Sequence, residues 1–254
     1  MIRRLLAHLK LWNWVLNLSD QSSRTVIDLY TTSSPNGFKA TIALEELALP
    51  YTVHHIKIAS GDNRQPAFLS INPYGRIPVI VDRETNITLF ESAAILLYLA
   101  EKTGQLLPSD SKGRWTAIQW LQFHSCSMGP ILGQRVHFET SDAKIPTAIA
   151  RYRRLSEEAF AILDARLAKV QFLAGDDYSI ADIATFAWVH VAGLCEFALE
   201  HHKNLALWRA RIQARPAVQK ALQSQSRQRV REARRGFSTI KSTHIQSKEG
   251  LKNW

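Results

Sequence analysis

The first half of the chain alternates between two patterns of hydrophobic and polar positions. Short runs rich in β-branched and aromatic residues predict strands, whereas apolar residues that recur every three or four positions predict amphipathic helices. In chain order, these patterns predict a strand at 25–30, a helix at 34–49, a strand at 51–58, a short helix or turn at 65–73, a hairpin of 76–82 and 87–90, and a helix at 91–104. The resulting order, β-α-β-α-β-β-α, is that of a thioredoxin-like domain.

The second half has helical spacing throughout and no convincing run of strand residues. Helices are predicted at 114–129, 145–169, 179–200 and 205–223. Ser179 and Asp182 have the spacing of a capping box, which satisfies backbone N–H groups at the start of a helix. We therefore expect an α/β thioredoxin-like N-terminal domain at 25–107 and an all-α C-terminal domain at 113–223.

Both ends of the chain lie outside these two domains. Residues 1–24 place apolar side chains near one helical face, a pattern that would suit a membrane-surface or organelle-targeting helix. We prefer the interpretation that this stretch is a basic amphipathic extension without a fold of its own. Residues 224–254 are basic and polar, which is typical of a disordered tail, although their arginine cluster could contact RNA or acidic lipid.

The net charge of +10 comes almost entirely from these ends. Residues 1–24 carry +3 and residues 224–254 carry +6, which leaves +1 for the rest, so we do not expect the core to bind nucleic acid. The two cysteines are too few for a disulfide scaffold and lack metal-ligand spacing, and no apolar run is long enough to span a membrane. We expect a cytoplasmic protein without a metal site.

Polar residues mark the junction between the first strand and the first helix. Ser34 followed by Pro35 is typical of a helix start, with serine as N-cap and proline at the first helical position. The same geometry could serve a thiol, because a helix N-terminus offers unpaired N–H groups and a partial positive charge. The Ser34 hydroxyl or the Asn36 amide would donate a hydrogen bond to the thiolate. No cysteine is present here, so the thiol would belong to a bound ligand; Tyr30, inside the strand, ranks below Ser34.

Two later stretches could bind the rest of such a ligand. If the bond before Pro78 is cis, as at this point of a thioredoxin-like fold, the Ile77 backbone could pair with a peptide; an edge strand with a trans bond is the alternative. Glu91 and Ser92 stand where a helix begins, so Ser92 could be a simple cap. Alternatively, Ser92 and the helix N–H groups would bind a carboxylate and Glu91 an ammonium group. Together these features suit a short acidic thiol peptide, with glutathione as the candidate.

Six segments, taken in order, resemble the cytosolic glutathione S-transferase superfamily across residues 26–222. The similarity is greatest to Nu-class, disulfide-bond reductase-type bacterial members and their fungal relatives. The segments are SPNGFKATIALEELALPY, INPYGRIPVIVD, LFESAAILLYLAEKTG, GPILGQ, IPTAIARY and YSIADIATFAWV. The resemblance implies a homodimeric enzyme with glutathione as its cosubstrate.

The resemblance also implies how glutathione is bound. Ser34 and Asn36 would be catalytic and face its sulfur, with Ser34 where the family more often has threonine. Ile77 would pair with its backbone, and Glu91 with Ser92 would hold its γ-glutamyl group.

Two further glutathione contacts follow from the resemblance alone. Asn63 stands where the family has a glutamine, which is longer by one methylene group. Arg151 would reach across the dimer to the ligand of the other subunit. Cys126 and Cys195 are expected to be buried in the helical domain rather than reactive.

The implied activity is that of a glutathione transferase or glutathione-dependent disulfide-bond oxidoreductase. The bound thiolate would attack small disulfides, hydroperoxides or electrophiles. An isomerase or dehalogenase would use a similar site. A different alternative is a non-catalytic binding or regulatory module that keeps this fold and works through its basic termini.

Overall fold

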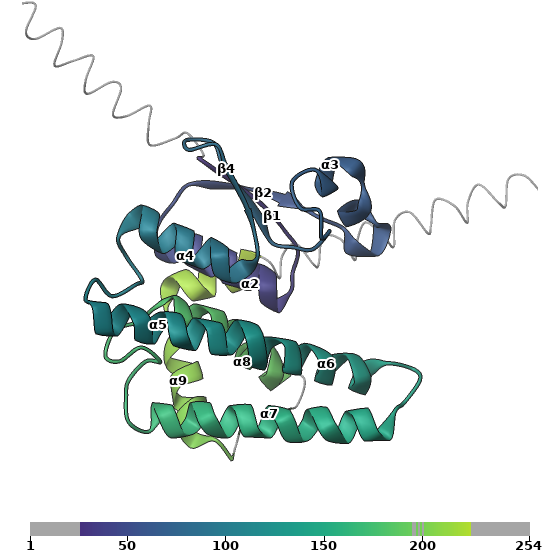
Figure 1. Ribbon diagram of the computed structural model, residues 1–254, viewed down its shortest axis with the longest axis vertical. Coiled ribbons are helices and arrows are strands. Elements are labelled where there is room, and N and C mark those ends of the chain that lie inside the picture. The colour runs from purple at the N-terminus through teal and green to yellow at the C-terminus, as the bar shows by residue number, and fades with distance from the viewer. Residues whose placement is uncertain (1–25, 195–196, 198, 200, 225–254) are drawn as a thin grey trace, which may run out of the picture.

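The computed structural model describes residues 26–194, 197, 199 and 201–224 (Figure 1). Its N-terminal part is built on a four-stranded sheet with the order β2-β1-β3-β4. The elements of this part are β1 (Ile27–Thr31), α2 (Pro35–Glu46), β2 (Tyr51–His55), two 3-10 turns (Ile58–Ser60 and Asp62–Arg64), α3 (Pro66–Leu69), β3 (Val79–Asp82), β4 (Ile87–Phe90) and α4 (Ser92–Thr103). The predicted order β-α-β-α-β-β-α is confirmed.

The sheet is mixed, as a thioredoxin-like domain requires. Strand β1 runs parallel to β2, with Leu29 opposite Val53, and antiparallel to β3, with Leu29 opposite Ile80. Strand β4 continues the sheet antiparallel to β3. Leu29 and Ile80 are fully buried, and burial of such a side chain contributes about 1.5–3 kcal/mol to folding.

The C-terminal part of the described chain is helical, which confirms the predicted fold class. Its elements are α5 (Ser111–Phe123), a π-helical turn (His124–Met128), α6 (Gly129–Thr140), α7 (Pro146–Leu167), α8 (Ile180–Leu194), α9 (Lys203–Gln213) and a helical stretch at 216–224. The predicted helix at 205–223 is interrupted before Pro216, because proline cannot continue a helix at that point. The sequence patterns also missed α6, which follows the π-helical turn without a break.

The two parts meet through helices α2 and α4. Figure 1 shows these helices between the sheet and the helical domain, with α7 on the side away from the sheet. Helix α2 contacts both α4 and α8, and α4 also contacts α8. Helices α2 and α4 therefore join the sheet-containing part to the helical part.

Helix α8 starts at the predicted Ser179–Asp182 pair, but only half of the capping box forms, because the Ser179 hydroxyl donates to the Asp182 carboxylate and does not accept from the Asp182 N–H. Asp182 is fully buried, and its carboxylate accepts hydrogen bonds from the backbone N–H of Ser179 at 3.0 Å and of Leu173 at 2.9 Å. It also accepts from the Ser179 hydroxyl at 3.0 Å and the Trp208 indole at 2.9 Å. One side chain thus joins the preceding loop, α8 and α9.

Several sequence expectations need a correction or fall outside the described residues. Cys126 is exposed, so its predicted burial is wrong: the π-helical turn directs His124 and Met128 inward and leaves Cys126 on the outer side. Cys195, the extension 1–24 and the tail beyond residue 224 lie outside the described residues. Within the described part, no helix is both long and apolar enough to cross a bilayer.

Candidate functional site

The site begins at the N-terminus of α2. Ser34 is the N-cap, and its Oγ accepts a hydrogen bond from the Gly37 N–H at 3.1 Å. Because this oxygen accepts, the hydroxyl proton stays available for donation, and it has no acceptor among the described residues. A Cβ atom at Gly37 would come within 2.2 Å of the Thr32 carbonyl oxygen, so only glycine allows this close turn.

The Asn36 amide beside it has a defined orientation. Its Oδ1 accepts hydrogen bonds from the Lys39 Nζ at 3.0 Å and from the Trp188 Nε1 at 3.2 Å. The Trp188 indole N–H and the charged form of Lys39 can only donate, so the amide oxygen must face them. The Asn36 NH₂ group is left without a partner within the described part of the chain. Asn36 therefore presents a donor at the helix start.

The N-terminus of α4 offers a second group of donors. Its first backbone bond runs from the Ile95 N–H to the Glu91 carbonyl at 3.0 Å. The N–H groups of Ser92, Ala93 and Ala94 have no partner among the described residues. Glu91 holds the N-cap position with φ 69° and is exposed. Unpaired N–H groups next to an exposed carboxylate suit an amino-acid head group, whose carboxylate and ammonium need opposite partners.

The loop before β3 lies between these features in the sequence. The Ile77–Pro78 peptide bond is cis. Among the described residues, the Ile77 N–H and C=O have no hydrogen-bond partner. Asn63 is buried, and its Nδ2 donates to the Gly75 carbonyl at 2.8 Å, which holds this loop. A contact of Asn63 with a ligand stays a prediction, and its amide nitrogen is already engaged.

Lys39 is the part of the site that the sequence patterns missed. Only 4% of it is exposed, and its Nζ donates to both Asn36 Oδ1 and, at 3.2 Å, Ser92 Oγ. Burial lowers the pKa of Lys39 to about 7, although the Glu91 carboxylate raises it in part. Lys39 stands three residues after Asn36, which places both on one helix face. This three-residue spacing was the sequence signal that could have added Lys39 to the site.

The helical domain supplies the opposite wall of the site. Trp188 comes from α8 and is bonded to Asn36, as described above. His124 is fully buried, and neither ring nitrogen has a hydrogen-bond partner among the described residues. Burial holds the pKa of His124 well below its ordinary value, and the nearby Lys39 charge lowers it further. His124 is therefore a neutral packing group.

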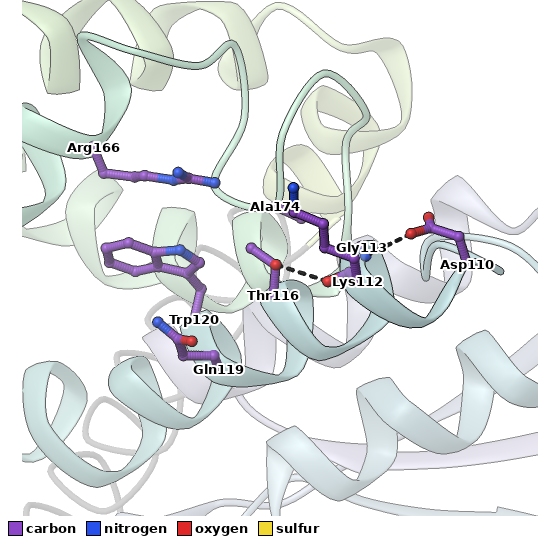
Figure 2. Close-up of a pocket in the computed structure, with 8 residues that line it drawn as sticks. All are labelled: Asp110, Lys112, Gly113, Thr116, Gln119, Trp120, Arg166 and Ala174. Atoms are coloured by element: carbon purple, nitrogen blue, oxygen red, sulfur yellow. Dashed lines mark hydrogen bonds between the residues drawn. The ribbon is translucent and has the colours of Figure 1, made fainter.

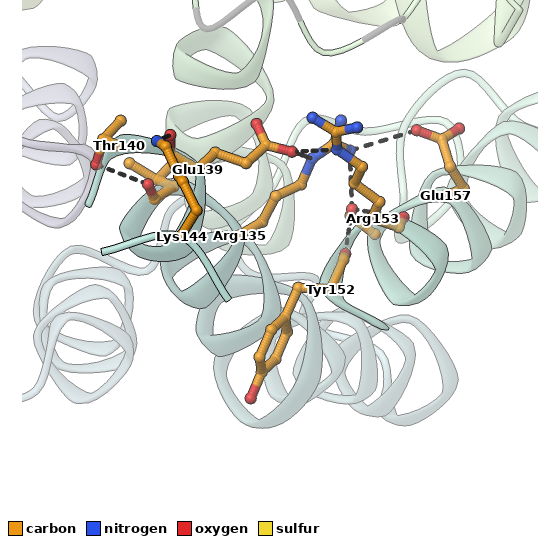
Figure 3. Close-up of polar contacts among 9 residues, drawn as sticks. Arg135, Glu139, Thr140, Lys144, Tyr152, Arg153 and Glu157 are labelled. Carbon is orange, nitrogen blue, oxygen red and sulfur yellow. Dashed lines mark hydrogen bonds and ion pairs between the residues drawn. The ribbon is translucent and has the colours of Figure 1, made fainter. Parts of the chain in front are cut away.

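Arg151 is a predicted site residue that, within a single chain, lies apart from the residues at the starts of α2 and α4. It is exposed on α7, which lies away from the sheet (Figure 1). Figure 3 shows the polar network nearby: Glu139 accepts from Arg153 at 2.7 Å and from the buried Arg135 at 3.3 Å. Arg135 also donates to Ser156 at 2.8 Å. This network joins α6 to α7 and is structural.

A separate cavity of about 560 Å³ opens on the helical domain (Figure 2). It contains none of the predicted site residues. Its lining residues are Asp110, Lys112, Gly113, Thr116, Gln119, Trp120, Arg166 and Ala174. Among the described residues, no group of three or more His, Cys, Asp or Glu side chains could hold a metal ion. The reactive candidates therefore remain those at the starts of α2 and α4.

Comparisons with known proteins find similar sequences. The family models for the Glutathione S-transferase N-terminal and C-terminal domains match residues 33–102 and 143–216. The chain is 40% identical to the disulfide-bond oxidoreductase YfcG of Escherichia coli (strain K12), over 78% of this chain and 94% of that protein.

Solved structures are similar in fold as well. A glutathione transferase from Burkholderia graminis with two glutathione molecules bound per subunit is 40% identical, with a TM-score of 0.75 over 79% of this chain and 88% of that one. A glutathione transferase from Pseudomonas putida with one glutathione disulfide bound per subunit is 34% identical, with a TM-score of 0.74 over 79% and 92%.

Proposed function

Because this chain belongs to the glutathione S-transferase family, we propose that it is a glutathione-dependent disulfide-bond oxidoreductase or transferase. The observation that carries the proposal is the set of unpaired donors at the starts of α2 and α4, with no cysteine among them. Such a site can bind a ligand that carries a thiol and can favour ionisation of that thiol. The name of the E. coli relative favours disulfide reduction over the other reactions of the family.

The residues present suit the thiol, the cysteinyl unit and the γ-glutamyl group of glutathione. Ser34 and Asn36 would hold the sulfur, the unpaired Ile77 backbone would pair with the cysteinyl unit, and Glu91 with Ser92 would bind the γ-glutamyl group. Unpaired donors at a helix start attract anions through the positive end of the helix dipole. Each binding element therefore has the polarity that its part of the tripeptide requires.

Glutathione supplies the thiol, and in disulfide reduction two glutathione thiols are oxidised to one disulfide while the substrate disulfide is reduced to two thiols. The chain's own residues lower the pKa of that thiol. The Ser34 hydroxyl and the Asn36 NH₂ group donate to the sulfur and stabilise its anionic form more than its neutral form. The relative from Burkholderia graminis, with two glutathione molecules per subunit, supports a site with room for both thiols.

We propose that the active form is a cytoplasmic homodimer, in which Arg151 reaches the glutathione of the other subunit. Its exposed position on α7 supports this arrangement, because the side chain has no hydrogen bond or ion pair among the described residues of its own chain. Light scattering gives the oligomeric state. Arg151→Ala should then weaken glutathione binding without changing that state.

The γ-glutamyl site can be tested by replacing Glu91 and Ser92 together with alanine. We expect the affinity for glutathione to fall by more than about 100-fold, because charge-assisted hydrogen bonds contribute about 1.5–3 kcal/mol each. Isothermal titration calorimetry measures the change. Glu101→Ala, on the exposed face of the same helix, is the matched control and should bind like the wild type.

Unchanged binding in the double variant would refute this site. Retention of the wild type on immobilised glutathione, together with turnover of a small disulfide, supports the enzyme. Retention without turnover would instead support a binding module.

The sulfur site can be tested with Ser34→Ala. Loss of one donor to a thiolate should raise the pKa of the bound thiol by about one to two units, since a hydrogen bond to a charged group is worth about 1.5–3 kcal/mol. Turnover should therefore fall at neutral pH and recover at alkaline pH. The ultraviolet absorbance of the thiolate reports the pKa directly. Ser33→Ala is the control, and an identical pH profile in both variants would remove Ser34 from the mechanism.

A further inference from the structure

Lys39 is a buried cation that contacts both groups of donors, one at the start of α2 and one at the start of α4. It projects from α2, is 4% exposed, and donates to the Asn36 amide of its own helix and to the Ser92 hydroxyl of α4. No carboxylate lies within ion-pair distance of its ammonium group among the described residues. A buried ammonium without a carboxylate at contact distance is costly, so its position calls for a functional reason.

The polarity of its hydrogen bonds supplies that reason. An ammonium group can only donate, so the Asn36 oxygen and the Ser92 oxygen must both accept from Lys39. The remaining atoms of the two groups are then donors: the Asn36 NH₂ group and the Ser92 hydroxyl proton. A thiolate and a carboxylate both require donors. A neutral or acidic residue in place of Lys39 would leave the Ser92 hydroxyl able to turn its acceptor toward the ligand, and the Asn36 amide would be held by the Trp188 indole alone.

We propose that Lys39 is a positioning residue that orients Asn36 and Ser92 as donors toward the two anionic groups of bound glutathione. This inference rests on the proposed function and adds to it a buried cation that links the thiol site to the γ-glutamyl site. Lys39 acts through its two partners and is not assigned a contact with the ligand itself.

Its charge should couple ligand binding to proton uptake. Two titratable groups face Lys39: Glu91 at the start of α4, whose carboxylate favours the charged lysine, and the neutral His124 of the π-helical turn. Without ligand, burial holds the pKa of Lys39 at about 7. An anion arriving at Ser92 favours the ammonium form and raises that pKa. Above about pH 7, binding should therefore take up a proton at Lys39.

The test uses S-methylglutathione, whose blocked sulfur releases no proton. Calorimetry near pH 8 in two buffers of different ionisation enthalpy should show net proton uptake by the wild-type protein. Its affinity should fall as pH rises above about 7, by up to about tenfold per pH unit. Lys39→Met should bind about 10- to 100-fold more weakly, should lose the proton uptake and should have a flat pH profile between pH 6.5 and 8.5. Lys169→Met, an exposed lysine after α7, should behave like the wild type.

The outcomes separate this inference from the proposed function. If the wild type does not bind, the proposed function fails and the inference fails with it. If it binds without proton uptake, or if Lys39→Met binds with unchanged affinity and proton uptake, only the role of Lys39 is overturned. The wild-type measurement decides the question even if the variant folds poorly, and a thermal melt of each variant shows whether it does.

Discussion

Replacing Asp182 with alanine should destabilise the folded chain by about 3–5 kcal/mol. The fully buried carboxylate accepts four hydrogen bonds, and its removal leaves two backbone N–H groups, a hydroxyl and an indole without an acceptor. Each buried donor without a partner costs about 1–3 kcal/mol, and the costs are not fully additive. Urea unfolding followed by circular dichroism measures the difference.

Asp177→Ala is the matched control for this prediction. Asp177 is exposed and precedes the same helix, so its loss should change the unfolding free energy by less than about 0.5 kcal/mol. Equal effects of the two substitutions would show that the buried Ser179–Asp182 pair carries no special share of the stability.

Asp182 should also give the protein a pH-dependent stability. Burial raises its pKa from 3.8 to about 6, and the hydrogen bonds lower it only in part. A group with a raised pKa in the folded state contributes fully below its unfolded value, and this contribution is lost as pH rises to about 6. The unfolding free energy of the wild type should therefore fall relative to that of Asp182→Ala between about pH 4 and 6. Parallel profiles would contradict the shift.

The second large effect is expected from Asn36→Asp, which should lower kcat/KM for disulfide reduction by about 10²–10³-fold. An aspartate keeps an oxygen for Lys39 and Trp188 but replaces the outward NH₂ group with a second oxygen. The thiolate then loses a donor and faces a negative charge. Losses of this size are typical when one preorganised donor to a developing anion is removed.

Steady-state kinetics and a thermal melt distinguish this effect from unfolding. Asn86→Asp makes the same chemical change in the exposed turn between β3 and β4 and should leave the rate unchanged. Asn36→Asp with wild-type turnover would exclude Asn36 as a donor to the sulfur.

Local rules explain what the sequence could predict. The Ser34-Pro35 start of α2 and the Ser179–Asp182 pair depend on neighbours within four positions, so their patterns are readable without a fold. The element order followed from hydrophobic spacing for the same reason. The start of α4 was also found, although Glu91, rather than Ser92, takes the N-cap position.

Contacts between distant segments explain what could not be predicted. Lys39 is normally a solvated residue type, and its burial depends on α4 and the π-helical turn, which close over it only in the folded chain. The hydrogen bond from Trp188 to Asn36 joins residues 152 positions apart. Cys126 was misplaced because the π-helical turn changes the helical register, which hydrophobic periodicity does not show.

The bond between Trp188 and Asn36 limits how the second domain can evolve. The helical wall must vary if relatives are to accept differently shaped electrophiles. Trp188 belongs to helix α8 of the helical domain, and its indole fixes an amide in the other domain. A change at this tryptophan in the helical domain should therefore also alter the orientation of the Asn36 amide, so variation of the helical domain should proceed around it.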